Sequence, residues 1–313
     1  MGKINVLITS AGRRVRLVEN FKLYANVFTC DMNPSLSAAC QVSDYFFKVP
    51  RVTDKNYIDF LLQQCKNLNI NMIVPTIDPE LEILAKNKEN FKKEGIFIAG
   101  SSENICKTFA LKSSTYKFFK ENGFLTPEIV DDIETAKYPL FAKLNNSSLS
   151  VGAQKVNSIE EAKILLSKNK NYVFQEYIDA TEFTVDVFIN KKGAVISIVP
   201  RERIEVRCGE INKGRTKKDS LIISEVKRLC NKLNEAYGVL TIQLFKKDNK
   251  IYFIEINPRF GGGYPLSWQA GADYAKFLID DYLGKELKYF EEWKDNLIML
   301  RYDNEVLIDG NSI

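Results

Sequence analysis

The first hundred residues alternate short apolar runs with helix-like stretches, and this alternation constrains the fold more than any other feature of the chain. Between the third and fourth runs, apolar residues recur at helical spacing from Ile58 to Leu68. Strands that are separated by helices run parallel, with the helices covering the sheet. We therefore predict a doubly wound α/β domain at the N-terminus. Its expected strands are Ile4–Thr9, Val27–Cys30, Tyr45–Val49, Met72–Pro75 and Ile96–Ala99.

After about residue 107 the pattern changes, because apolar runs begin to follow one another without helices between them. A helix through Lys112–Lys120 comes first, and the runs Tyr138–Leu144 and Val151–Val156 then flank a polar loop. Ser158 and Glu161 form a capping box that begins another helix. Successive apolar runs of this kind favour antiparallel strands. We expect a small α+β lobe here.

The remainder of the chain combines strands with one long amphipathic helix. Apolar residues from Ile222 to Tyr237 form one helical stripe, and Gly238 stands where a C-cap is expected. We expect this part to form a second, larger lobe. The strands expected before the helix are Tyr172–Ile178, Glu182–Ile189 and Ala194–Val199.

Composition excludes several kinds of chemistry. The 313 residues include no histidine, which removes His-based catalytic triads and His-ligated metal sites. The net charge of +4 provides no basic face of the kind that nucleic acid or anionic lipid requires. The six cysteines form no CxxC pair, and neither a run of 18 apolar residues nor a signal peptide is visible. We therefore expect a cytoplasmic protein whose chemistry uses carboxylates, amides, Lys and Arg.

One hairpin carries the strongest chemical signal. Its strands are Val239–Phe245 and Ile251–Ile256, and a polar, turn-forming cluster separates them. Gln243 lies in the first strand, whereas Glu255 and Asn257 end the second, two residues apart and therefore on one face. All three side chains carry oxygen ligands.

The length of the turn decides whether Gln243 joins the other two. An odd-length turn over Asp248–Lys250 pairs Gln243 with Glu255, whereas a two-residue turn pairs it with Ile254; we predict the odd-length turn. A carboxylate and amide oxygens at the end of a hairpin suit Mg²⁺, which prefers oxygen ligands and bridges nucleotide phosphates. Exposed polar residues at strand ends are the alternative, and strand periodicity leaves it open.

The segment from Glu255 to Gly263 reads E-I-N-P-R-F-G-G-G and resembles the E-x-N-P-R signature of ATP-grasp enzymes. The resemblance is greatest to the carbamoyl-phosphate synthetase large-subunit branch and its stand-alone carboxylate-amine ligase relatives, and it extends over nearly the whole chain. It implies a Rossmann-like pre-ATP-grasp domain over residues 1–106 and a two-lobed ATP-grasp domain with antiparallel sheets over residues 107–313. The lobes would be a small lid (about 107–178) and a larger nucleotide and metal lobe (179–313).

This resemblance also assigns roles to the hairpin. It implies that Gln243, Glu255 and Asn257 hold Mg²⁺, in two ions, with Mn²⁺ as an alternative. Arg259 would face the transferred phosphate. Upstream, Lys112 and Lys143 occupy the places of two basic residues that reach the phosphates of ATP.

Further ATP contacts are implied along the small lobe. Its polar loop has the place of a flexible loop that covers the phosphates, although it is rich in serine where many relatives are rich in glycine. Glu182 resembles the acid that accepts the ribose hydroxyls. The serines implied to donate to phosphate are Ser147, Ser148 and Ser150, and the hinge implied to read adenine through backbone groups is Gln175, Glu176, Tyr177 and Ile178.

The implied reaction does not need histidine, because Mg²⁺ with Lys or Arg can position and neutralise a transferring phosphoryl group. Arg201, Arg203 and Arg207 follow a strand, and Lys213 comes shortly after them. In the family such cations face the acceptor or the γ-phosphate. We single out Arg203 and Lys213 as catalytic candidates beside Arg259; a solvated basic loop is the alternative.

Two features of the N-terminal domain bear on the acceptor. Asp78 follows a parallel strand, at the carboxyl edge where α/β sheets bind ligands. It either receives a substrate amine or caps the following helix. The turn Thr9–Arg14 lacks the G-x-G-x-x-G pattern of dinucleotide sites, and we expect it to cradle substrate or to close the domain interface.

We predict an ATP-dependent ligase that activates a small-molecule carboxylate as an acyl phosphate for attack by an amine, yielding ADP and phosphate. One alternative is bicarbonate phosphorylation of the carbamoyl-phosphate synthetase type. Another is a non-catalytic ATP-binding subunit, because Leu111 and Leu144 replace the Asp and Pro that relatives carry beside the two lysines. The expected partners are small molecules rather than nucleic acid or a membrane, and a homodimer is compatible with this prediction.

Overall fold

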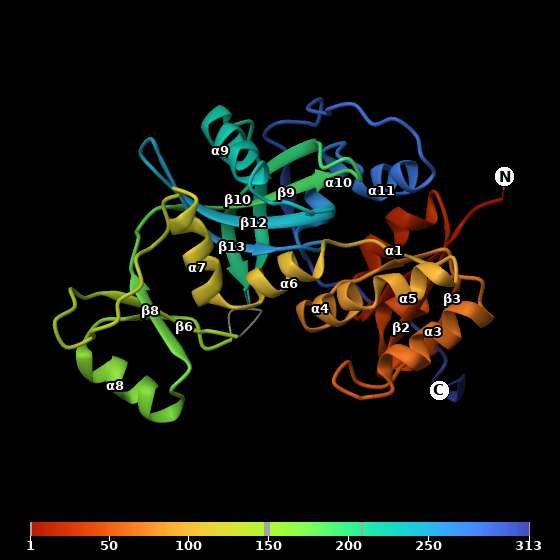
Figure 1. Cartoon of the computed structure of the whole chain (residues 1–313), viewed down its shortest axis with the longest axis horizontal. Coiled ribbons are helices and arrows are strands. Elements are labelled where there is room, and N and C mark those ends of the chain that lie inside the picture. The colour runs from red at the N-terminus through yellow and green to blue at the C-terminus, as the bar shows by residue number, and fades with distance from the viewer. Residues whose placement is uncertain (1, 147–150, 208, 313) are drawn as a thin grey trace.

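The computed structural model describes residues 2–146, 151–207 and 209–312. Within these residues the chain forms three sheets, with the largest in the middle of the molecule, the parallel N-terminal sheet at one end and a small antiparallel sheet at the other (Figure 1). Among the same residues, no helix combines the length and the apolarity needed to cross a membrane.

The N-terminal sheet has the strand order β3-β2-β1-β4-β5, and all neighbouring strands run parallel, as the alternating pattern predicts. Helices cover both faces, and each face has its own buried apolar cluster. The strands are β1 (Asn5–Thr9), β2 (Asn26–Asp31), β3 (Tyr45–Lys48), β4 (Met72–Val74) and β5 (Phe97–Ile98). The helices are α1 (Val15–Lys22), α2 (Ala38–Gln41), α3 (Tyr57–Asn67), α4 (Asp78–Lys86) and α5 (Lys88–Lys93).

The small lobe is an antiparallel sheet in the order β7-β6-β8, packed against one helix. That helix begins as the capping pattern predicts, because the Ser158 hydroxyl accepts a hydrogen bond from the Glu161 amide at 3.4 Å. The elements of this lobe are β6 (Leu140–Leu144), β7 (Gln154–Val156), α8 (Ile159–Lys168) and β8 (Tyr172–Glu176), and α6 (Glu103–Ala110) and α7 (Lys112–Glu121) precede them.

The central sheet is antiparallel, in the order β13-β12-β9-β10-β11-β14. Antiparallel pairing is therefore confirmed for the second part of the chain. The strands are β9 (Thr181–Ile189), β10 (Val195–Arg207), β11 (Glu210–Thr216), β12 (Gly238–Lys247), β13 (Lys250–Asn257) and β14 (Ile298–Leu300). The helices are α9 (Ser220–Cys230), α10 (Tyr264–Gln269) and α11 (Tyr274–Tyr282).

The long helix predicted up to Tyr237 is wrong, because α9 ends at Cys230. Leu233 and Tyr237 are nonetheless buried, Leu233 in the same core cluster as the buried face of α9 and Tyr237 in the cluster shared with the N-terminal domain. Glu235 adopts a φ of 63°, and Gly238, with a φ of 78°, begins β12 instead of capping a helix. The apolar stripe therefore reflects burial in two core clusters and not a continuous helix.

One buried cluster joins the N-terminal domain to the central sheet. The ring of Phe21 in α1 contacts that of Phe260, with centroids 5.8 Å apart, and Phe260 contacts Tyr264 at 4.8 Å. Burial of large aromatic rings of this kind contributes strongly to packing. The segment that follows β13 is thus held in a core shared by both domains.

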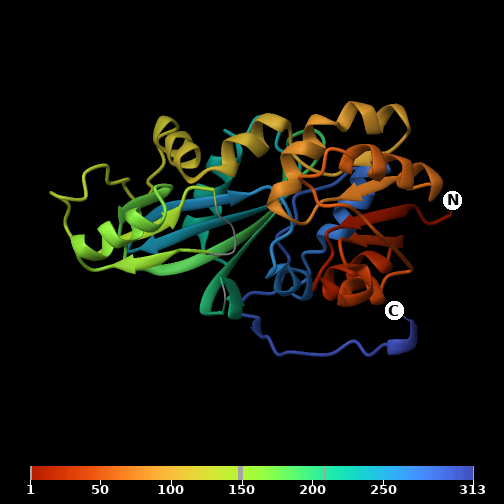
Figure 2. The same ribbon diagram turned by 90° about the horizontal axis from the view of Figure 1, so that it is seen from below.

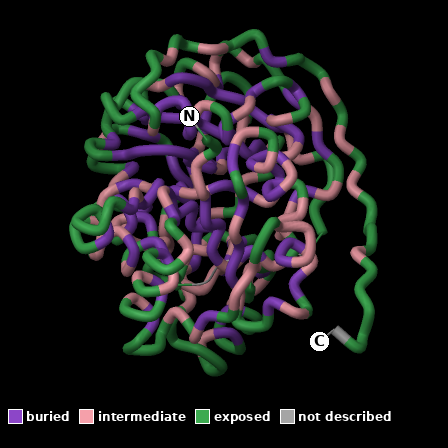
Figure 3. Tube along the Cα trace, turned by 90° about the vertical axis from the view of Figure 1, so that its right-hand side faces the viewer, coloured by how far each residue is buried: buried purple, intermediate pink, exposed green. Residues whose placement is uncertain are grey.

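The chain after β14 forms an extended segment that leaves the central sheet and runs past the N-terminal domain (Figure 2). Most of its residues are exposed, in contrast to the buried strands of both large sheets (Figure 3).

Candidate active site

The hairpin of β12 and β13 brings Gln243 opposite Glu255, as predicted. The reason differs from the predicted one. The turn has two residues, because Lys247 pairs with Lys250, and a bulge in β13 then shifts the register by one residue before Gln243 is reached. A bulge inserts one unpaired residue into one strand and so reverses the parity of the pairing beyond it. Asn257, opposite Thr241, is buried at the end of the same strand.

Lys112 lies against this hairpin, with its Nζ 3.1 Å from an oxygen of Glu255. Both side chains are largely buried, at 11% and 18% exposure. Asn145, which follows β6, fixes the start of α7: its backbone carbonyl accepts from the Lys112 amide and its side-chain oxygen accepts from the Ser113 amide, each at 2.9 Å. Asn145 thus satisfies, through its backbone and its side chain, two helix donors that the N-cap residue Leu111 leaves free.

Replacing Asn145 with Ala should lower the free energy of unfolding by about 1 kcal/mol, the usual loss for a helix cap. It should also weaken ATP binding, because the first turn of α7, which carries Lys112, loses the acceptor of its Ser113 amide. Urea unfolding and calorimetric titration with ATP measure the two effects. Asn146→Ala, at the exposed neighbouring residue, is the matched control. Equal behaviour of the two variants would contradict this interpretation.

Lys143, Glu182 and Arg203 form a second group beside the hairpin. An Arg203 nitrogen lies 3.0 Å from Glu182, and the Arg203 side chain is only 6% exposed. Burial lowers the pKa of Lys143 to about 8, with Glu255 and Glu182 raising it and Lys112 lowering it further. Burial likewise raises the pKa of Glu182, which Arg203 and Lys143 oppose. Glu182 and Glu255 thus influence the pKa of Lys143, as Arg203 and Lys143 influence that of Glu182, so these charges act on one another in a partly buried environment.

ATP binding should therefore weaken as the pH rises through 8. A lysine with a lowered pKa is charged below that value and neutral above it, so the attraction to phosphate is complete at pH 7 and falls from about pH 8 upward. Lys143→Arg should flatten this profile, because arginine stays charged. Titration with ATP between pH 6.5 and 9 checks the result, and a wild-type affinity that does not change with pH would contradict it.

Arg259 connects the signature segment to the N-terminal domain. Its guanidinium donates to both oxygens of Asp78, at 2.8 and 3.0 Å, across 181 positions of sequence. Asp78 is thus neither a free receptor for an amine nor the cap of α4. Glu80 caps α4 instead, its buried carboxylate accepting from the amides of Thr76 and Ile77 at 2.7 and 3.1 Å.

Arg14 is a site residue that the sequence reasoning did not single out. It donates to the backbone oxygens of Thr76 and Phe260, at 2.8 and 3.2 Å. The turn before α1 therefore closes the domain interface, which was one of the two roles predicted for it. Burial and the neighbouring Arg259 lower the pKa of Arg14 to about 10, so it is cationic at neutral pH.

A buried ion pair lies beneath the signature segment. Arg201 and Asp186 are 1% and 0% exposed and meet at 2.8 Å. Asp186 also accepts from Ser267 at 2.6 Å, and Thr241, next to Asp186, donates to the carbonyl of Arg259 at 3.0 Å. A side chain on Gly263 would come within 2.1 Å of Arg201, so the chain can cross the guanidinium only at glycine.

The other predicted cations lie elsewhere on the strand pair β10–β11. Lys213 is 46% exposed and forms an ion pair with Glu205 at 2.6 Å. Arg207 is 67% exposed and pairs with Asp303 at 3.2 Å. These cations lie on a strand pair and not on a basic loop, and β10 becomes exposed towards its end, so Arg201 and Arg203 are buried whereas Arg207 is exposed. Within the described residues, the structure does not bring Lys213 to the Lys112–Glu255 pair.

The predicted hinge lies at the end of β8. Gln175 is buried and donates to the Pro127 carbonyl at 3.2 Å, while the Glu176 amide donates to the Glu128 carbonyl at 2.9 Å. Tyr177 packs under the Lys155 ammonium, 4.4 Å from its ring centre, and Ile178 follows it outside the strand. The predicted phosphate-contacting serines Ser147, Ser148 and Ser150 lie outside the described residues.

The oxygen donors of the hairpin fit a hard divalent cation. Glu255 supplies one carboxylate, and Gln243 and Asn257 supply amide oxygens at the same end of the sheet. No cluster of three acidic, cysteine or histidine side chains suited to a metal occurs in the described part of the chain. An ion here would therefore be held by few protein ligands and by phosphate oxygens, which is the usual arrangement for Mg²⁺ at nucleotide sites.

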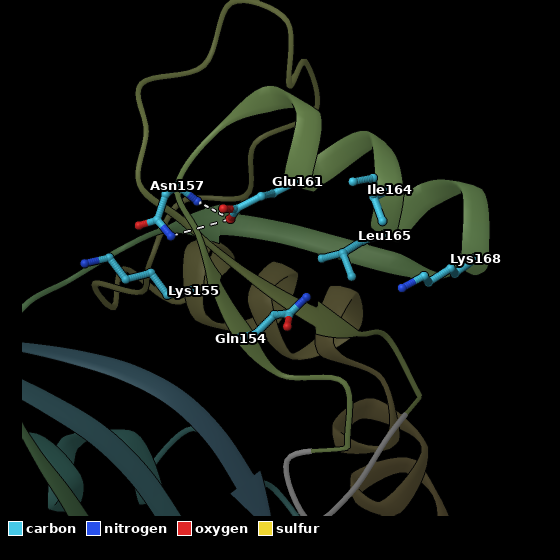
Figure 4. Close-up of a pocket in the computed structure, with 7 residues that line it drawn as sticks. All are labelled: Gln154, Lys155, Asn157, Glu161, Ile164, Leu165 and Lys168. Carbon is cyan, nitrogen blue, oxygen red and sulfur yellow. Dashed lines mark hydrogen bonds between the residues drawn. The ribbon is translucent and has the colours of Figure 1, made fainter.

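A shallow pocket between β7 and α8 does not belong to this group (Figure 4). Its floor includes the contact of the Asn157 amide with Glu161, at 2.8 Å. The residues that line it are Gln154, Lys155, Asn157, Glu161, Ile164, Leu165 and Lys168, and none is a predicted site residue.

Comparison with known proteins gives two family matches and several relatives. Residues 6–99 match the model of the PylC-like N-terminal domain, and residues 109–263 match that of the ATP-grasp domain. The carbamoyl phosphate synthase large chain of Thermoanaerobacter sp. is 26% identical over 224 residues, covering 64% of this chain and 21% of that protein. The D-alanine–D-alanine ligase B of Clostridium tetani is 28% identical and covers 56% of each chain. The tyramine–L-glutamate ligase of Methanocaldococcus jannaschii is 27% identical and covers 75% of each.

The chain thus spans about a fifth and about half of the length of the first two relatives. Among solved structures, the biotin carboxylase domain of the Hydrogenobacter thermophilus 2-oxoglutarate carboxylase, determined with MgADP and bicarbonate, matches with a TM-score of 0.73, 16% identity and coverage of 95% of this chain and 74% of that one. The L-amino acid ligase of Bacillus licheniformis matches with a TM-score of 0.70, 18% identity and coverage of 90% and 75%. At these identities the likeness establishes the fold.

Proposed function

We propose that this chain, which carries a PylC-like N-terminal domain followed by an ATP-grasp domain, is an ATP-dependent ligase that joins a small-molecule carboxylate to an amine. The observation that carries the proposal is the gathering of cations and oxygen ligands from three parts of the fold around the β12–β13 hairpin. The small lobe contributes Lys112 and Lys143, the central sheet contributes Glu182, Arg203 and the hairpin itself, and the N-terminal domain orients Arg259.

The residues divide into roles by their charge and position. Lys112 and Lys143 would bind the ATP phosphates, Glu182 the ribose hydroxyls, and the end of β8 the adenine. The buried Nε of Arg203 has no hydrogen-bond partner among the described residues, which supports a position for Arg203 near the transferred group. Buried donors are normally paired, so an unpaired one favours a missing ligand. A role for Lys213, and the domain boundaries at 106 and 178, stay predictions.

Gln243, Glu255 and Asn257 would hold Mg²⁺, in two ions, with Mn²⁺ as the alternative. When bound, the metal neutralises phosphate charge and orients the phosphoryl group. The chain's own residues position the reactants: a carboxylate oxygen of the acceptor attacks the γ-phosphorus and ADP leaves. The amine then attacks the acyl carbon, and phosphate leaves. Arg259, held by both oxygens of Asp78, would face the transferred phosphate in an orientation fixed before substrate arrives.

Two alternative functions are each favoured by a specific observation. Similarity to the carbamoyl phosphate synthase large chain favours bicarbonate as the carboxylate, although the chain spans only 21% of that protein. The leucines beside the two lysines favour an ATP-binding subunit without turnover. We further propose a cytoplasmic location, which the five described cysteines support because all are free and buried, and a homodimer as the form to test in solution.

The proposal is tested by phosphate release from Mg-ATP in the presence of amino acids, sugar acids and bicarbonate, each alone and with candidate amines. Glu255→Gln serves as the blank. Stimulation by a carboxylate together with an amine supports the ligase, and stimulation by bicarbonate alone supports the first alternative. ATP that raises the melting temperature while no carboxylate stimulates turnover would overturn the ligase in favour of the binding subunit.

A further inference from the structure

Arg301, in the extended segment after β14, reaches the glycines of the signature segment. The β11–β14 ladder positions it, because the Arg301 amide donates to the Asn212 carbonyl at 3.0 Å. One guanidinium nitrogen lies 2.8 Å from Glu210, and another donates to the carbonyl of Gly262. Arg301 thus contacts a residue of the signature segment that lies three positions after Arg259.

Arginines and carboxylates gather around Arg301. Arg14, Arg259 and Arg301 lie between the domains, and Asp78, Glu80 and Glu210 are the carboxylates that pair with or lie close to them. Burial lowers the pKa of Arg14 and of Arg203, and Glu210 opposes it in both. Arg203 also donates to the Gly209 carbonyl at 3.0 Å, so Glu210 directly follows a residue that contacts Arg203, while its own side chain contacts Arg301.

Of the ion pairs formed by Arg201, Arg203, Arg259 and Arg301, the Glu210–Arg301 pair is the most exposed, and a ligand can therefore exchange it most easily. Arg259 is held by two hydrogen bonds to Asp78, and Arg201 is fully buried with Asp186. Arg301 and Glu210 are 31% and 30% exposed and share one contact, and ion pairs that water reaches are weak. The Glu210 carboxylate fills the space beside Gly262, where a side chain would come within 2.5 Å of it.

We propose that Arg301 is a specificity-determining residue for the acceptor, and that it binds a second carboxylate of that acceptor after the carboxylate displaces Glu210. The inference rests on the proposed function, since it assumes an acceptor between Arg203 and the interdomain arginines. It names the acceptor's class as a dicarboxylate, with one group to be phosphorylated and one to be recognised. Glu210 occupies the place of the recognised group when no acceptor is bound.

The test compares dicarboxylates from malonate to adipate with monocarboxylates of equal chain length. Their affinities are measured by calorimetry, with and without Mg²⁺ and a non-hydrolysable ATP analogue. Wild-type protein should bind at least one dicarboxylate about tenfold or more tightly than its monocarboxylate partner. Arg301→Met should remove this preference and leave monocarboxylate binding unchanged. Glu210→Gln should strengthen dicarboxylate binding, because it removes the competing group.

Arg207→Met is the matched control, because Arg207 forms an exposed pair with Asp303 in the same segment. It should leave all affinities unchanged. A purely structural pair predicts that Arg301→Met and Glu210→Gln weaken binding alike and lower the melting temperature alike, and that result would overturn the proposal. Absence of any dicarboxylate preference in the wild type would also overturn it. Phosphate release stimulated only by monocarboxylates would leave the ligase intact and remove this inference alone.

Discussion

Replacing Glu255 with Gln is expected to reduce ATP-dependent turnover by about 10³-fold. Glu255 is the single carboxylate among the three hairpin ligands, and a bound metal contributes several kcal/mol to a phosphoryl transfer state, about 4 kcal/mol for a 10³-fold change. The substitution keeps the shape of the side chain and removes its charge. It also removes the anionic partner of Lys112, so both the metal and the lysine lose their position.

Two measurements separate these effects from misfolding. The melting temperature of Glu255→Gln without ligand should stay close to that of the wild type, whereas the additional stabilisation that Mg²⁺ gives to the ATP complex should be lost. Glu103→Gln, in an exposed ion pair with Lys107 on α6, is the control for loss of a carboxylate and should keep full turnover. Turnover of Glu255→Gln within tenfold of the wild type would contradict the metal assignment.

Replacing Asp186 with Leu should lower the free energy of unfolding by about 3–5 kcal/mol. Removal of one partner of a buried ion pair leaves the other charge in a dry environment without compensation. Arg201 would keep its charge at 1% exposure, and Ser267 would lose its 2.6 Å acceptor. Chemical denaturation, with the slope of the transition checked for two-state behaviour, measures the loss.

A double substitution shows whether charge or packing is responsible. Asp186→Leu combined with Arg201→Met removes both charges and should recover most of the lost stability, because apolar replacements of buried pairs are often neutral or stabilising. The loss should be non-additive, since the two side chains are in contact. Glu225→Gln, in the exposed pair with Arg228 on α9, should cost under about 1 kcal/mol. If the double variant is as unstable as Asp186→Leu alone, the loss of stability comes from packing and not from charge.

The β12–β13 hairpin shows what the periodicity of apolar residues can predict and what it cannot. The alternation of apolar residues identifies both strands, and the polar exceptions identify Gln243, Glu255 and Asn257. The pairing of Gln243 with Glu255 is correct, but it arises from a bulge and a two-residue turn and not from an odd-length turn. A bulge leaves no clear trace in the apolar pattern, because it changes the pairing of the strands and not their composition.

Asp78 and Asn145 show what local sequence leaves open. Asp78 follows a strand and precedes a helix, a position that suits a cap or a ligand, and the structure uses it to hold Arg259. Asn145 sits in a polar loop and caps a helix that begins 33 positions earlier in the chain. Hydrogen-bond partners that are distant in sequence depend on how the lobes pack, and no spacing rule contains that information.

By itself, the sequence determined the parallel N-terminal sheet and the antiparallel sheets that follow, because apolar periodicity is a local property. The residues assigned to metal and phosphate stay predictions. Only the tertiary structure decided which charges meet. Arg14, Asp78 and Arg259 come together because one aromatic core joins the two domains, and Arg201 is buried while Arg207 is exposed because β10 runs from the core to the surface. Electrostatic partners are chosen by packing, which acts between segments that the chain itself keeps far apart.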